Sequence, residues 1–301
     1  MEIIATGLRF PEGPIAMSDG SVILVEIERG TLSRVSAEGE ISVIADLGGG
    51  PNGAAIGPDG ACYVCNNGGF DWHRPSGRLI PGDQAADYSG GRIERVDLET
   101  GEVTTLYTEC NGTPLKGPND IVFDREGGFY FTDHGKAQGR LRDRGAVFYA
   151  KPDGSEIREI VFPMEAPNGI GLSPDEDFLY VAETPTARLW KFKISEPGTL
   201  ELMPPMGGEC IAGMGGFQMF DSLAVDAEGH VCVATIINGG ITSISPDGKT
   251  IRHVPTEDGL TTNICFGGED LRTAYITLSS MGQLVKVTWE TPGLPLNYLN
   301  M

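Results

Sequence analysis

The chain is short of basic residues: 22 Lys and Arg stand against 42 Asp and Glu among 301 residues, which gives a formal net charge of −20. This charge opposes the phosphates of nucleic acids and the headgroups of anionic membranes, so we expect neither as a partner. No stretch approaches the roughly 18 apolar residues of a membrane span, and the N-terminus lacks a basic start followed by an apolar core. These absences predict a cytoplasmic protein.

Cysteine is scarce as well, with six residues at positions 62, 65, 110, 210, 232 and 265 and no disulfide framework. Cys62 and Cys65 form a C-x-x-C pair, but they fall in an expected strand, where residues i and i+3 face opposite sides. We therefore expect buried free thiols rather than a zinc or redox site. The pattern G-x-S-x-G is absent, which disfavours a serine hydrolase.

The chain is rich in turn-forming residues and contains a repeated sequence pattern. Its 43 Gly and 20 Pro suit tight turns, whereas apolar stripes at a period of about 3.6 residues are missing. Six segments repeat a polar residue, an apolar strand, a turn and a second strand. Their leading residues are Glu12, Asn52, Asn119, Asn168, Asp221 and Asn263, separated by 40, 67, 49, 53 and 42 residues. This repeat predicts an all-β fold, a six-bladed β-propeller that forms a single domain over residues 1–301.

The turn chemistry orients each blade. Pairs such as Asp59-Gly60 and Glu126-Gly127 are typical of hairpins, so the second strand returns to the face where the leading residue lies. We expect the loops that follow the second strands to share this polar face: 66–69, 133–136, 183–186, 236–240 and 279–282. An insertion, residues 70–91, rises from the same face as a possible lid, with a mere surface excursion as the alternative. Residues 2–8 are expected to close the ring by pairing beside residues 283–289.

Equivalent positions of a propeller converge on its axis, so the leading residues predict a central metal site. They offer carboxylate and amide oxygens and no His or Cys, which favours one hard divalent cation. Asp120 follows a leading residue directly, and strand alternation predicts that it turns away from the axis into backbone or inter-blade hydrogen bonds. Asp226 is interpreted in the same way.

Several of these runs resemble the senescence marker protein, gluconolactonase and luciferin-regenerating family. They are Phe10-Pro11-Glu12-Gly13-Pro14, Pro118-Asn119-Asp120, Pro167-Asn168-Gly169-Ile170 and Asp221-Ser222-Leu223-Ala224-Val225-Asp226. The segments GGFYFTD from Gly127 and DFLYVAET from Asp177 are similar to the family's drug-responsive bacterial lactonases. The resemblance covers nearly the whole chain and implies metal-dependent hydrolysis of a small lactone. By motif position it places the metal on Glu12, Asn119, Asn168 and Asp221.

Ca²⁺ is the first choice for the ion, with Mg²⁺, Mn²⁺, Zn²⁺ and Fe²⁺ as alternatives. Asp221 is the first candidate for the general base, since the family places both ligation and base function there, and His134 is the second. The expected substrate-binding residues are Asn52, Lys116, His134, Glu183, Trp72 and His73.

One departure from the family concerns specificity. Sugar lactonases of the family carry Arg two residues before the Asn of the Asn-Asp pair, where this chain has Gly117. We therefore expect a lactone with fewer hydroxyl groups than an aldonolactone. Two other functions stay open: a phosphotriesterase of the diisopropylfluorophosphatase kind, and a non-catalytic propeller in which Ca²⁺ only locks the blades. The oligomeric state cannot be predicted.

Overall fold

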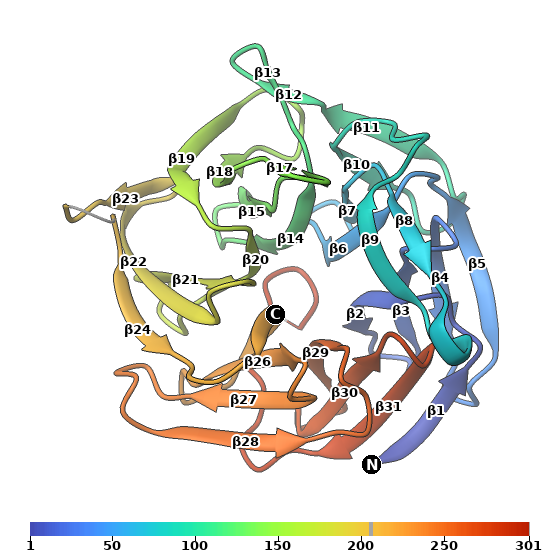
Figure 1. Cartoon of the computed structure of the whole chain (residues 1–301). Helices are drawn as coiled ribbons and strands as arrows, with labels where there is room; N and C mark the ends of the chain where they lie inside the picture. The colour runs from blue at the N-terminus through green and yellow to red at the C-terminus, as the bar shows by residue number, and fades with distance from the viewer. Residues whose placement is uncertain (205–206, 301) are drawn as a thin grey trace.

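The computed structural model describes residues 1–204 and 207–300. These residues form six antiparallel sheets that stand like blades around a central axis (Figure 1). The helical element among them is one 3-10 turn, Pro75–Gly77. The predicted all-β, six-bladed propeller is confirmed.

Each blade runs from a first strand at the axis to a last strand at the rim. Blade 1 comprises β2 (Pro11–Ala16), β3 (Val22–Glu26), β4 (Thr31–Val35) and β5 (Ile41–Asp46), and blade 2 comprises β6 (Pro51–Ile56), β7 (Cys62–Asn66), β10 (Arg92–Val96) and β11 (Val103–Tyr107). Blade 3 comprises β14 (Pro118–Phe123), β15 (Phe129–Asp133), β18 (Gly145–Ala150) and β19 (Ile157–Met164).

Blade 4 comprises β20 (Pro167–Leu172), β21 (Phe178–Glu183) and β22 (Arg188–Glu196), and β22 pairs with both β23 (Thr199–Glu201) and β24 (Glu209–Gly213). Blade 5 comprises β25 (Met219–Val225), β26 (Val231–Ile236), β27 (Gly240–Ile244) and β28 (Ile251–Pro255). Blade 6 comprises β29 (Thr261–Gly267), β30 (Thr273–Leu278), β31 (Gln283–Thr288) and β1 (Glu2–Thr6). Short ribbons outside the blades are β8 (Phe70–His73) with β9 (Ile80–Gln84), β12 (Glu109–Cys110) with β13 (Thr113–Pro114), and β16 (Ala137–Gln138) with β17 (Leu141–Arg142).

The ring closes as expected from the sequence. The N-terminal strand β1 pairs antiparallel with β31, with Ile3 opposite Val285 and Thr6 opposite Gln283. Blade 6 is therefore built from both ends of the chain, and β1 covers what would otherwise be an open sheet edge.

Apolar and aromatic side chains fill the space between neighbouring blades. Between blades 2 and 3, Tyr63 packs edge-on against Phe123 with ring centroids 5.0 Å apart, and both contact Phe129. All six cysteines are free; Cys62 and Cys65 are buried, as predicted, and Cys210 is exposed.

A register irregularity marks the start of every first strand. The pairing with the second strand shifts between Glu12 and Ile15 in blade 1, and at the equivalent place in the five other blades. Such a β-bulge interrupts the alternation of side chains and re-aims those beside it. Two consecutive residues can therefore point toward the axis.

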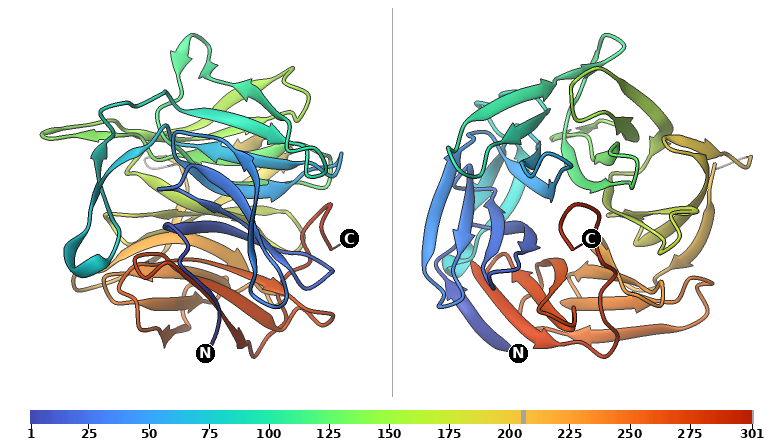
Figure 2. Two further views of the ribbon diagram at one scale, coloured as in Figure 1. Left: turned by 90° about the vertical axis from the view of Figure 1, so that its right-hand side faces the viewer. Right: turned by 180° about the vertical axis from the view of Figure 1, so that it is seen from behind.

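The two faces of the disk carry different segments (Figure 2). Residues 70–91 follow β7, whose last residue pairs with the first residue of β6, so they lie on the face of the leading residues. The C-terminal segment lies on the opposite face, beside the hairpins that join first and second strands.

Candidate metal centre and active site

The leading residues form a ring around the axis. Asn263 of blade 6 donates from Nδ2 to Oε2 of Glu12 in blade 1 at 2.6 Å, so the first and last blades meet here. Between blades 4 and 5, the hydroxyl of Ser222 donates to Oδ1 of Asn168 at 3.4 Å. Residues up to 251 positions apart in the sequence are thus neighbours.

Glycines after the leading residues allow the first strands to approach so closely. A Cβ atom on Gly13 would lie 2.6 Å from the carbonyl oxygen of Asn52, and one on Gly53 would lie 2.5 Å from that of Asn119. Any larger residue would push these blades apart. Asn52 therefore occupies its predicted place in the ring, between Glu12 and Asn119.

The ring concentrates negative charge in a buried place. Glu12 is 2% exposed, and Asp221 is partly buried. Burial raises the pKa of both carboxyl groups, and the charge of Glu12 raises the pKa of Asp221 further. Two carboxylates held together in this way would be stabilised by a cation.

Asn119 supplies the observation that fits a cation most directly. Its side chain is buried, and its Oδ1 accepts no hydrogen bond from any residue within 1–204 and 207–300. A buried carbonyl oxygen without a partner costs free energy, and most such atoms in proteins are paired. The oxygens of Glu12, Asn119, Asn168 and Asp221 form a donor set suited to a hard ion. No cluster of three His, Cys, Asp or Glu occurs in the described chain, so amide oxygens would complete such a site.

The expectation that Asp120 turns away from the axis is wrong. It lines the cavity on the axis instead of turning away, and burial together with the charge of Glu12 raises its pKa. The bulge between Pro118 and Ile121 breaks the alternation on which the expectation depended. The expected backbone hydrogen bond does exist, because the amide of Ile121 donates to Oδ1 of Asp120 at 3.0 Å.

A second set of polar residues holds the chain that leads into the ring, and the sequence analysis missed its role. The last residue of the second strand accepts a backbone N–H from the segment before the leading residue in four blades: Glu26 from Arg9, Asn66 from Gly50, Asp133 from Lys116 and Gly117, and Glu183 from Glu165. Their common place in the repeat was a signal that could have revealed them. Glu183 also accepts from the hydroxyl of Thr186 at 2.7 Å, so both of its carboxylate oxygens have partners within the protein.

His134 and Lys136 lie in the loop after β15, on the polar face. Burial, with the charge of Arg142, lowers the pKa of His134 to about 3, so its imidazole is neutral at pH 7. Lys136 is 4% exposed and donates from Nζ to Oδ1 of Asn67 at 2.9 Å and to the carbonyl of Gly69 at 2.8 Å. Burial lowers its pKa to about 7.

The insertion, residues 70–91, extends over the rim of several blades. Lys136 of blade 3 lies 3.7 Å from the ring centroid of Phe70, and Trp72 packs on Phe10 of blade 1 at 5.1 Å between centroids. At its tip, the amide of Leu79 donates to the carbonyl of Ser280 in blade 6 at 3.1 Å. The insertion therefore connects blades 3, 1 and 6 on the polar face.

Two other expected substrate contacts, His73 and Lys116, are more exposed than His134. His73 in the insertion and Lys116 before blade 3 both have exposed side chains. The carbonyl of Lys116 accepts a hydrogen bond from the hydroxyl of Tyr88 at 2.6 Å, which ties the insertion to blade 3.

Comparison with known proteins matches this architecture. The profile of the SMP-30/gluconolactonase/LRE-like region covers residues 10–280. The chain belongs to the SMP-30/gluconolactonase/LRE-like family. It is 25% identical to a gluconolactonase of Zymomonas mobilis, over 97% of this chain and 82% of the relative. It is 27% identical to the lactonase drp35 of Staphylococcus saprophyticus, over 84% of this chain and 72% of the relative.

The family fold is also seen in solved structures. Regucalcin of Agrobacterium tumefaciens, described as a calcium-binding protein, superimposes with a TM-score of 0.75 at 18% identity, over 97% of this chain and 94% of that protein. The resemblance inferred from the ring motifs is confirmed.

Within this family, the place of Gly117 is structurally constrained. Its amide donates to Oδ1 of Asp133 at 2.7 Å, and a Cβ atom on it would lie 2.6 Å from the carbonyl oxygen of Gly135. The position therefore has no room for a side chain as large as arginine.

Proposed function

We propose that the protein is a metal-dependent hydrolase that opens a small lactone. Glu12, Asn119, Asn168 and Asp221 would hold one divalent cation, with Ca²⁺ as the first choice and Mg²⁺, Mn²⁺, Zn²⁺ and Fe²⁺ as alternatives. The observation that carries the proposal is the buried oxygen of Asn119, which has no partner among the described residues, in a ring with the buried Glu12 and the partly buried Asp221. The relatives named gluconolactonase and lactonase support lactone hydrolysis, and the calcium-binding neighbour supports the ion.

The bound cation would polarise the lactone carbonyl and stabilise the negative charge that develops on its oxygen. Asp221 is the proposed base that takes the proton from the attacking water. Glu12 is almost fully buried and its Oε2 already accepts from Gly13 and Asn263, whereas Asp221 is partly exposed and can meet a water. The lowered pKa of His134 makes it a weaker base, so it stays the second candidate after Asp221. Its neutral imidazole can orient the water or the substrate by a hydrogen bond.

The proposed substrate is a small lactone with few hydroxyl groups. Gly117 leaves no side chain to bind sugar hydroxyls. The exposed side chain of Lys116, whose carbonyl accepts from Tyr88, remains a proposed substrate contact. Trp72, packed on Phe10, would give the polar face an apolar wall, while Asn52 and His73 remain the proposed polar contacts. For Glu183 we propose an indirect part, because its carboxylate already holds its own loop.

The proposal is tested by chelating the purified protein and restoring each of the five cations separately. Aldono-, hydroxy acid and aromatic lactones are assayed beside fluorophosphates. We expect hydrolysis to require a cation and to favour lactones with few hydroxyl groups. Turnover of fluorophosphates alone would support the phosphotriesterase alternative, and turnover of neither class with any ion would support a non-catalytic propeller.

Matched substitutions test the ligand set. Glu12→Gln and Asp221→Asn should each lower kcat/KM about 100- to 1000-fold, the scale of losing one stabilising group. Asp226→Asn is the control, because Asp226 accepts the amides of Glu228 and His230 and contacts the His230 ring, all within one hairpin. Full activity of the first two variants after chelation would disprove the metal-dependent mechanism.

A further inference from the structure

A cavity of about 440 Å³ lies on the axis between the ring and the opposite face. The first strands of all six blades line it, through side chains that include Ile15, Ala55, Val122, Leu172, Ala224 and Phe266. Pockets of a few hundred Å³ are typical of small-molecule sites. Because most of its lining is apolar, an apolar occupant would be stabilised there by removal of apolar surface from water.

The C-terminal tail, residues 294–300, covers the outer end of this cavity. Leu294, Pro295, Leu296, Asn297 and Leu299 belong to its lining. These residues follow blade 6 and close one end of the cavity.

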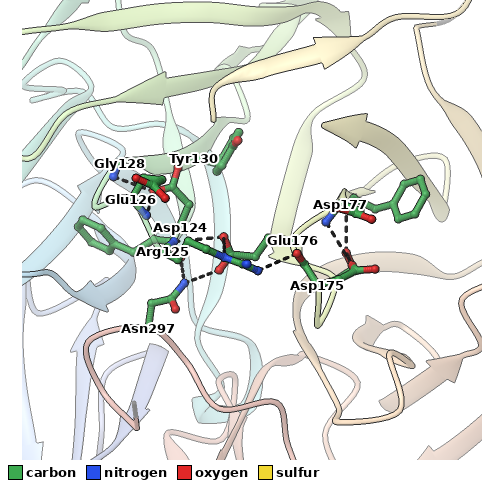
Figure 3. A network of polar contacts seen from close by, with 12 residues as sticks. Asp124, Arg125, Glu126, Gly128, Tyr130, Asp175, Glu176, Asp177 and Asn297 are labelled. Atoms are coloured by element: carbon green, nitrogen blue, oxygen red, sulfur yellow. Dashed lines mark hydrogen bonds and ion pairs between the residues drawn. The ribbon is translucent and has the colours of Figure 1, made fainter. Parts of the chain in front are cut away.

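Side chains alone hold the outer part of the tail to the blades. The amide of Leu294 donates to Val225 at 3.0 Å, but beyond it the backbone hydrogen bonds within the described chain are internal, such as Asn300 to Leu296. Asn297 donates from Nδ2 to Oε1 of Glu176 at 2.7 Å and to the carbonyl of Phe123 at 3.1 Å (Figure 3). Tyr298 adds a hydrogen bond from its hydroxyl to the carbonyl of Arg125 at 3.0 Å and an edge-on contact with Phe123. A segment held by side chains, without strand pairing, can open locally without unfolding a blade.

The charges at the mouth define the class of molecule that could enter. Arg125 and Glu176, which pair with each other, line this end of the cavity, and Glu126, Asp175 and Asp177 lie beside them in the network of the blade 3 and blade 4 hairpins (Figure 3). This acidic rim repels anions. Apart from Asp120 and Asn263 at the inner end, the wall is mostly aliphatic and aromatic, and it disfavours a charged molecule because a charge in an apolar environment loses its hydration.

We propose that this cavity, which adjoins the ring at Asp120 and Asn263 and extends to the opposite face, is a second binding site for an uncharged apolar small molecule, and that residues 295–300 are its gate. The ligand enters from the face opposite the insertion, and the tail closes behind it. The proposal does not rest on lactone hydrolysis, and probe binding is measured without a lactone, so its failure and the failure of the proposed activity are distinguishable.

The neutral fluorescent probe N-phenyl-1-naphthylamine tests the site in the full chain. We expect saturable binding of one probe per chain that lactones do not displace. Ala55→Phe and Ala224→Phe each fill the cavity from a different blade and should weaken binding at least tenfold with lactone hydrolysis unchanged. Ala37→Phe adds the same ring to an exposed turn and should bind as the unmodified protein does. Equal affinity in folded filled variants, or no saturable binding, would overturn the proposal.

Hydrogen exchange of the unmodified protein gives a test that needs no substitution. The probe should protect amides of the first strands and the tail. Protection confined to residues 70–91 would place the probe on the other face and overturn the site.

The gate is tested by two substitutions with the same charge change. Asn297→Asp replaces the donor to Glu176 by a second carboxylate, so the tail should open and the stopped-flow association rate of the probe should rise severalfold. Asn300→Asp is the control, because Oδ1 of Asn300 only accepts the amide of Leu296 and a carboxylate can do the same. Equal rates for the two variants would overturn the gate.

Discussion

The side chain of Asn119 combines burial with an oxygen that no described residue satisfies. A structural role and a ligand role predict opposite effects of removing that oxygen. If the oxygen is only unsatisfied, the near-isosteric change Asn119→Leu removes a penalty of about 1–3 kcal/mol and should stabilise the protein. If it binds an ion, the same change should abolish stabilisation by that ion.

We expect Asn119→Leu to melt at or above the temperature of the unmodified protein in chelator, and to lose most of the increase that Ca²⁺ gives. Differential scanning calorimetry with and without Ca²⁺ measures both. Asn297→Leu, which changes the same residue type at the opposite face, should retain the Ca²⁺ effect. An unchanged Ca²⁺ effect in Asn119→Leu would remove Asn119 from the ligand set.

The buried Lys136 should make the free energy of unfolding depend on pH. Its pKa is lowered to about 7 in the folded protein by burial, whereas an unfolded lysine has a pKa of about 10.4. Between these values the unfolded chain binds more protons, so stability rises with pH, and the cost of burying the charge is complete below about pH 7. Lys136→Met removes this cost. Its advantage in unfolding free energy should be largest at pH 6 and should shrink as the pH rises from 7 toward 10, by roughly 1.4 kcal/mol per pH unit at most.

Urea denaturation at pH 6, 8 and 9.5 measures this trend as a difference between the two proteins, in which the other titrating groups cancel. Lys249→Met is the control, because the side chain of Lys249 is 82% exposed and folding leaves it hydrated. A difference between Lys136→Met and the unmodified protein that does not change with pH would contradict the lowered pKa.

At the scale of elements, the insertion is attached at separate points and leaves the blades themselves intact. Trp72 packs on Phe10, next to the strand that carries Glu12, so Trp72→Ala should loosen the insertion where it approaches the ring. We expect KM for the preferred lactone to rise about tenfold, or about 1.4 kcal/mol, with kcat and melting temperature little changed.

Steady-state kinetics and calorimetry measure these effects together. Ile251→Ala truncates an exposed apolar side chain of β28 at the rim and should leave KM unchanged. A fall in melting temperature without a change in KM would show that Trp72 serves the fold and does not reach the substrate.

The elements also show where sequence reasoning succeeds and where it fails. The six leading residues and their turns suffice to predict which loops share a face, because a hairpin reverses a strand by a rule that local chemistry sets. Asp120 was misplaced because the bulge beside it depends on contacts between blades, which no local pattern reveals. The part that Glu183 plays in holding its loop was missed, because it depends on the amide of Glu165, on a different segment.

At the scale of the whole molecule, the number of blades and the closure of the ring could be predicted, since both follow from counting repeats and from two terminal segments that match a missing strand. The tail could not be predicted. Its course across the axis depends on side-chain contacts such as Tyr298 with the carbonyl of Arg125, at 3.0 Å, between positions 173 residues apart.

Because strand β1 closes the ring, its removal should destabilise the fold and expose a sheet edge. Strand β1 pairs with β31 through four positions and places Ala5 in the core, so deletion of residues 1–6 would leave β31 as an open edge. We expect the deletion to lower the free energy of unfolding in urea by on the order of 3 kcal/mol and to produce dimers or larger species by size-exclusion chromatography. Glu2→Ala, which removes only the exposed ion pair of Glu2 with Lys286, should cost less than about 1 kcal/mol. If the deletion costs no more than Glu2→Ala, the ring is held by contacts between blades and the terminal strand is dispensable.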